Sequence, residues 1–109
     1  MAKQITITYN DNQYTLEFTR DTVQKLDRAG IVAQDIATKP MSVLPALFRG
    51  AFLAHHKNIK AETVDDIYAH MPNKEKLIEL LVSMYNEPIE TLFDEPEESE
   101  KNAQWEASW

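Results

Sequence analysis

The sequence contains no cysteine, only two glycines and no long apolar run. Without cysteine, the chain cannot form disulfides, thiolate metal sites or cysteine nucleophiles. Gly30 and Gly50 stand apart from each other, so the chain has no glycine-rich phosphate-binding loop. No apolar stretch reaches the roughly 20 residues that span a bilayer, and the first residues lack the apolar segment of a signal peptide. We therefore expect a cytoplasmic protein without membrane contact.

Basic residues are also scarce. The chain has 11 lysines and arginines against 18 acidic residues, a formal net charge of −7 and a pI near 4.8. The basic residues are spread singly, and an acidic protein without a basic patch repels a phosphate backbone. We expect no nucleic-acid partner. A length of 109 residues with 43% apolar content favours one domain with a modest core.

The polar residues form no recognisable catalytic or metal-binding pattern. His55 and His56 are adjacent in the sequence, so on a helix they point in different directions and cannot bind one metal ion. His70 follows Asp66 by four residues, a spacing typical of a surface contact. The serines lack the setting of a nucleophile elbow. We predict that the protein is not an enzyme and binds neither metal nor cofactor.

The first residues alternate between apolar and polar side chains, as β-strands do. Ile5–Tyr9 and Tyr14–Phe18 show this pattern, and Asn10–Gln13 between them is rich in turn-forming residues. We predict a hairpin over residues 4–18 with a loop of about four residues. An isolated hairpin is marginally stable in water, so it packs on the chain's own helices or joins strands of another subunit. The second arrangement would give a homo-oligomer through an unpaired edge strand.

Apolar residues at helical spacing follow the hairpin. Thr19 is suited to cap the first helix and Gly30 to end it. Ser42 is suited to cap the second helix, and Pro88 predicts a break at Asn86-Glu87. The predicted helices span residues 20–29, 43–56, 61–71, 74–86 and 88–93. The predicted fold is α+β and mostly α, with an N-terminal β-hairpin and a compact bundle of about four helices in one domain over residues 1–93.

The helix predicted at 43–56 is apolar nearly all round. Such a helix is either buried centrally or covered by a partner. Core packing accounts for the whole stripe, and the alternative is that part of it is open to another protein. The candidate partner-binding residues on this helix are Leu47, Phe48, Phe52 and Leu53.

Composition changes after Phe93. Residues 94–109 contain six acids, one lysine and no aliphatic residue larger than alanine, so we expect an acidic, flexible tail. Both tryptophans of the chain, Trp105 and Trp109, lie here, four residues apart. Tryptophan is well suited to anchor an interface. These two residues are therefore further partner-binding candidates, unless they fold back onto the chain's own helices.

The chain resembles a family of small tail assembly chaperones from tailed phages and prophages of Gram-positive bacteria. The resemblance is one of overall pattern and rests on EFTRDTVQKLDRAG (17–30), KPMSVLPALFRGAFLAHH (39–56), NKEKLIELLVSMYNEPIETL (73–92) and NAQWE (102–106). It implies a non-enzymatic protein that binds the tape measure protein, with the major tail protein as a second client, and that has no catalytic residues.

Two other functions fit the same residues. The acidic tail is compatible with a regulatory or inhibitory protein of the antitoxin or DNA-mimic type, although its acids are scattered rather than spaced like phosphates. A structural component retained in the virion is the third reading. Gel-shift competition would identify an acidic mimic, and mass spectrometry of purified virions would identify a retained component.

Overall fold

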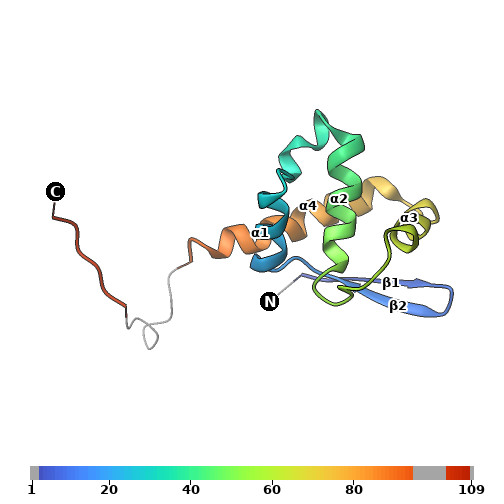
Figure 1. Cartoon of the computed structure of the whole chain (residues 1–109), viewed down its shortest axis with the longest axis horizontal. Helices are drawn as coiled ribbons and strands as arrows, with labels where there is room; N and C mark the ends of the chain where they lie inside the picture. The colour runs from blue at the N-terminus through green and yellow to red at the C-terminus, as the bar shows by residue number, and fades with distance from the viewer. Residues whose placement is uncertain (1–2, 95–102, 109) are drawn as a thin grey trace.

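The computed structural model describes residues 3–94 and 103–108. Within them, an N-terminal antiparallel hairpin is followed by four α-helices, which confirms the α+β, mostly α, fold. The elements are β1 (Ile5–Tyr9), β2 (Asn12–Leu16), α1 (Arg20–Arg28), the 3₁₀ turn η1 (Ala33–Ala37), α2 (Pro40–Phe52), α3 (Ala61–Ala69) and α4 (Lys74–Thr91). In Figure 1, α4 runs behind α1 and α2, and the hairpin lies along one side of the helices. Residues 103–108 contain neither helix nor strand.

The hairpin turn is shorter than the sequence predicted. Tyr9 pairs with Asn12, so only Asn10 and Asp11 form the turn, with φ angles of 50° and 66°. Positive φ at both central residues is the geometry of a two-residue hairpin turn, and asparagine and aspartate tolerate it better than most residues. The predicted four-residue loop was wrong because Asn12 and Gln13, although typical of turns, belong to β2. The hairpin register itself places Ile5, Ile7, Tyr14 and Leu16 on one face.

Both ends of α1 are as predicted. The Thr19 side chain accepts a hydrogen bond from the Thr22 backbone N–H, and Thr22 Oγ1 accepts one from the Thr19 N–H at 2.8 Å. At the other end, Gly30 adopts a φ of 79°, and the Ile31 N–H donates to the Leu26 carbonyl at 2.9 Å. These are a reciprocal N-cap and a Schellman C-cap, which depend only on nearby residues.

Helix α2 begins earlier and ends earlier than predicted. It starts at Pro40, where a missing N–H costs nothing, and Lys39 rather than Ser42 occupies the N-cap position. It ends at Phe52 rather than at residue 56. The Ala51 carbonyl accepts a hydrogen bond from the Glu17 N–H of the hairpin at 2.9 Å. A contact with the hairpin therefore occupies a carbonyl that a longer helix would use.

Helix α4 continues through Pro88. The predicted break at Asn86-Glu87 and the separate helix at 88–93 were therefore wrong. Pro88 is buried, and the Arg20 guanidinium donates to the Thr91 carbonyl at 2.8 Å, so α1 holds the end of α4 in place. This packing offsets the hydrogen bond that a proline removes from a helix interior.

The centre of the core is α2. Leu47, Phe48 and Phe52 are 0%, 1% and 0% exposed, and the Phe48 and Phe52 rings lie 5.1 Å apart in an edge-to-face arrangement. Of the two alternatives for this stripe, core packing accounts for these three side chains, because α1, α3, α4 and β2 surround the helix. Their burial corrects the alternative that this part of the helix is open to a partner. Leu53 is partly exposed. Gly50 allows the close approach of α1, since a Cβ at this position would lie 3.1 Å from Leu26 Cδ1.

Substitutions at adjacent positions distinguish a core residue from a surface residue. We expect Phe52→Ala to lower the free energy of unfolding by about 3–5 kcal/mol, because it opens a cavity in a closely packed core. Leu53→Ala, at a partly exposed site, should cost about 1 kcal/mol or less. Urea unfolding followed by circular dichroism measures both. Equal losses for the two variants would contradict the core position of Phe52.

Candidate functional site

The described part of the chain contains neither a cluster of metal-binding side chains nor a helix suited to span a membrane. Within residues 3–94 and 103–108, no group of three or more histidine, aspartate or glutamate side chains is placed to hold a metal ion. No helix in these ranges is long and apolar enough to cross a membrane. The surface carries two apolar grooves, exposed apolar side chains and a polar hollow of about 610 Å³. The polar hollow is lined by Tyr9, Asn10, Asn12, Tyr14, Glu62, Thr63 and Asp66. The apolar features are the candidates for a protein-binding site.

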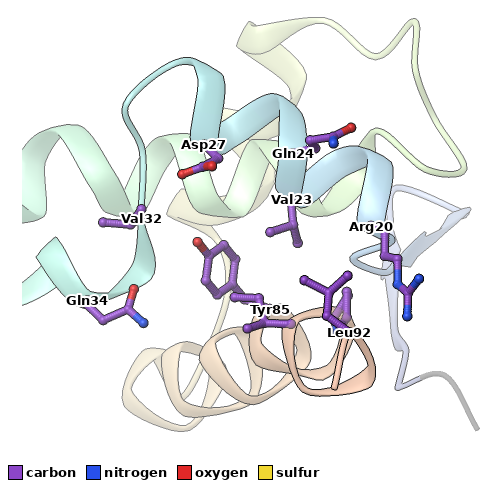
Figure 2. A pocket seen from close by; sticks show the side chains of 10 residues that line it. Arg20, Val23, Gln24, Asp27, Val32, Gln34, Tyr85 and Leu92 are labelled. Carbon is purple, nitrogen blue, oxygen red and sulfur yellow. The ribbon is translucent and has the colours of Figure 1, made fainter. Parts of the chain in front are cut away.

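The larger apolar groove lies between α1 and α4 and has a volume of about 440 Å³. We call it the α1–α4 groove. Figure 2 shows Val23 of α1 pointing toward Tyr85 and Leu92 from the α4 side, with Arg20 and Asp27 at the rim. Its lining residues are Arg20, Val23, Gln24, Asp27, Val32, Gln34, Tyr85, Pro88, Ile89 and Leu92. The groove thus combines an apolar floor with a mixed-charge rim.

Tyr85 forms part of the groove floor and is 2% exposed. Burial raises the pKa of its phenol, and the backbone of Ala33 partly opposes this shift by hydrogen bonding. The hydroxyl therefore stays protonated at neutral pH. A neutral phenol adds no charge to the floor, so the groove suits apolar side chains.

The groove continues into an exposed apolar end. Leu92 is 61% exposed and Phe93 is 84% exposed, directly after the last turn of α4. The spacing of Ile89, Leu92 and Phe93 predicted that all three face inward, and the structure corrects this for Leu92 and Phe93. No sequence signal distinguishes them from buried residues, because their exposure depends on where α1 begins, with Arg20 beside Thr91.

A second groove of about 360 Å³ lies between α2 and α3. Its lining is apolar apart from Asp65, and Met41 at its edge is 88% exposed. The lining residues are Pro40, Met41, Leu44, Pro45, Phe48, Val64, Asp65, Tyr68 and Ala69. Phe48, one of the candidate partner-binding residues, thus forms part of the floor of this groove, although its side chain is almost fully buried.

The C-terminal tryptophans divide between described and undescribed residues. Trp105 is 88% exposed, and Figure 1 draws residues 103–108 away from the helices. Trp109, the other predicted partner-binding residue, lies outside the described residues. A fully exposed tryptophan leaves its large apolar ring in water, so Trp105 is available for contact with another molecule.

The whole chain matches one family model. Residues 1–109 match the domain of unknown function DUF5055. The chain belongs to the DUF5055 family. No curated protein and no solved structure gives a significant match. The sites of this DUF5055 chain must therefore be argued from its own residues.

All three histidines of the DUF5055 chain lie where the hairpin meets the helices. His55 Nε2 donates to the Glu17 carboxylate at 2.7 Å, and His56 Nε2 accepts the Thr15 backbone N–H at 3.0 Å. The third histidine, His70, lies beside the Tyr9 ring, with centroids 5.5 Å apart. Each imidazole therefore links the N-terminal hairpin or the residue directly after it to the segment that follows α2 or α3.

The Glu17 contact makes stability depend on pH. The hydrogen bond from His55 lowers the pKa of the Glu17 carboxyl below its ordinary value of 4.5. Folding therefore favours the ionised carboxylate. The resulting stabilisation is present above pH 4.5 and is lost as pH falls through the lowered pKa.

We expect Glu17→Gln to lower the free energy of unfolding by about 1 kcal/mol near neutral pH, because a charge-assisted hydrogen bond is weakened. The difference from the wild type should shrink as pH falls through the lowered pKa of the wild-type carboxyl, because the wild-type side chain then also becomes neutral. Urea unfolding over a series of pH values from neutral downward tests this. Glu90→Gln, at an exposed site on α4, is the control, and a wild-type difference that stays constant with pH would contradict the assignment.

Proposed function

We propose that the chain is a non-enzymatic tail assembly chaperone that binds an amphipathic helix of a phage tape measure protein in the host cytoplasm. The proposal rests on the resemblance to tail assembly chaperones and on the α1–α4 groove. The major tail protein is proposed as a second client. In this function the protein holds a partner during assembly and catalyses no reaction.

The observation that carries the proposal is the apolar groove with an exposed apolar end. Leu92 and Phe93 contribute little to the chain's own core, yet they extend a groove whose floor is already apolar. Apolar surface that a fold leaves uncovered often marks a protein-binding site. A client helix with apolar side chains at helical spacing would place some of them in the groove and others on Leu92 and Phe93.

Charge favours a client helix with basic flanks. The chain carries a formal charge of −7, so lysines or arginines beside the apolar face of the client would be attracted. Arg20 and Asp27 at the rim provide one charge of each sign to orient it. The same net charge would keep a complex with an apolar, helical client dispersed in water.

Trp105 provides a second contact in this proposal. The ring is 88% exposed and lies beyond an acidic stretch of the sequence. Trp105 follows Phe93 by twelve positions in the sequence, a length of chain that spans at most about 40 Å. Trp105 would therefore reach a client held in the α1–α4 groove. A contact of this kind adds affinity without demanding a large rigid interface, which suits a chaperone that must release its client.

Removal of the exposed end of the groove tests the proposal. We expect the double substitution Leu92→Gln and Phe93→Gln to weaken binding to tape measure fragments by about tenfold or more, because buried apolar anchors dominate such interfaces. Met41→Gln, at the α2–α3 groove, is the matched control and should change the affinity less than about twofold. Isothermal titration calorimetry measures both. Wild-type protein that captures neither tape measure nor major tail protein at any salt concentration would overturn the proposal.

Tryptophan fluorescence tests the second contact. Trp105 and Trp109 are the only tryptophans of the chain, so intrinsic emission reports on the C-terminal segment alone when the client fragment lacks tryptophan. We expect a shift of the emission to shorter wavelength on client binding, because the ring leaves water. Trp109→Phe should retain the shift, and Trp105→Phe should reduce it. A shift that survives Trp105→Phe in full would contradict the role of Trp105.

A further inference from the structure

The outer edge of β2 is largely covered by the last turn of α2 and the segment that follows it. In an antiparallel pair, residues alternate between those that bond across to the partner strand and those whose backbone groups point outward. Thr15 and Glu17 belong to the second kind. The Thr15 N–H donates to His56 Nε2 at 3.0 Å, and the Glu17 N–H donates to the Ala51 carbonyl at 2.9 Å.

The outer edge of β1 has no such cover. Tyr9 and Asn12 flank the two-residue turn and bond to each other, so Thr6 and Thr8 are the residues of β1 that point their N–H and C=O groups outward. Both residues are exposed. Within residues 3–94 and 103–108, these outward groups have no hydrogen-bond partner.

The edge also lacks the features that keep edge strands apart. Natural proteins protect free edges with lysine, proline or a bulge. Strand β1 reads Ile-Thr-Ile-Thr-Tyr, has no charged residue and no proline, and pairs with β2 without a bulge. The chain has 11 basic and 18 acidic residues, but none of them lies in β1. Two copies can therefore meet at this edge without repulsion between like charges.

We propose that β1 pairs with β1 of a second copy of the chain, antiparallel and about a two-fold axis at Ile7. In this register Thr6 faces Thr8 of the second copy, and Thr8 faces its Thr6. The outward N–H and C=O groups of these residues then form four hydrogen bonds between the copies. Four strands in the order β2-β1-β1-β2 make one continuous sheet.

The facing side chains favour this register and this occupant. Residues that face each other across the axis have numbers that sum to 14, so Ile5 faces Tyr9 of the second copy, and the threonines face each other. Aromatic–β-branched pairs and Thr–Thr pairs are favourable cross-strand neighbours. A second copy therefore brings to this edge an uncharged strand whose side chains match those of β1.

The α4 surface beside β1 is compatible with an added strand. Lys3 Nζ donates to Ser83 Oγ at 2.8 Å, and the Lys3 backbone N–H donates to Glu87 at 3.2 Å. Leu80 lies one turn before Ser83 on the same face of α4, and it is 44% exposed. The interface is nevertheless small, so we expect a reversible dimer.

Proline substitution on the two edges tests the proposal. Thr8 and Gln13 face each other across the hairpin, and the N–H of each points outward. Neither Thr8→Pro nor Gln13→Pro removes a hydrogen bond within the hairpin, but only Thr8→Pro blocks the β1 edge. Sedimentation velocity from about 10 µM to about 1 mM covers the range expected for so small an interface. We expect wild type and Gln13→Pro to dimerise and Thr8→Pro to stay monomeric, with similar circular dichroism spectra.

Cysteine cross-linking tests the register without a proline. Facing residues that bond to each other lie about 5.5 Å apart at Cα, within the range of a disulfide. Because the wild type has no cysteine, a mixture of Thr6→Cys and Thr8→Cys copies should oxidise to the mixed dimer several times faster than either variant alone. Equal rates would overturn the register.

Three sedimentation results would overturn the dimer itself. The first is a wild type that stays monomeric at all concentrations. The second is a Thr8→Pro variant that still dimerises. The third is loss of dimerisation in Gln13→Pro to the same extent as in Thr8→Pro. If the wild type is monomeric but Thr8→Pro loses client binding, the edge takes a strand of the client instead of a second copy.

Discussion

The structure depends on the enclosure of α2. This helix has apolar side chains on nearly every face. Exposing them to water would cost more free energy than the net folding stability of a domain of this size. The hairpin and the other helices pack around it, and one backbone bond joins the two parts, from the Glu17 N–H to the Ala51 carbonyl. That hydrogen bond occupies a carbonyl in the last turn of α2, and it also satisfies an outward N–H beside the β2 edge. The packing of the hairpin against α2 therefore protects this edge as well.

The enclosure of α2 leaves apolar surface elsewhere. Helix α4 continues through Pro88 because α1 holds its last turn at Arg20 and Thr91. An uninterrupted α4 forms one wall of the α1–α4 groove, and Leu92 directly after it is exposed. A break before Pro88 would have let the final turn fold inward and cover itself. The groove that we propose for the client is thus a consequence of an uninterrupted helix.

The hairpin has one covered edge and one free edge, and the difference matters for assembly. The groups that cover β2 are the carbonyl of Ala51 in the last turn of α2 and the imidazole of His56 in the segment after it. No comparable segment reaches β1 among the described residues. A dimer through β1 would carry two α1–α4 grooves and two C-terminal segments. Two weak sites on one particle bind a long, repetitive client more tightly than one site does, and each site can still release.

The sequence alone determined the features that depend on neighbouring residues. Thr19 and Gly30 cap α1 through residues within one turn of them, and alternation over Ile5–Tyr9 defines β1. The tertiary structure decided what depends on distant residues. Arg20 holds α4 beyond Pro88, Glu17 ends α2 at Phe52, and the position of α1 leaves Leu92 exposed. Apolar residues have the same spacing in the sequence whether their side chains are buried or exposed, because burial depends on parts of the chain that are far away in the sequence.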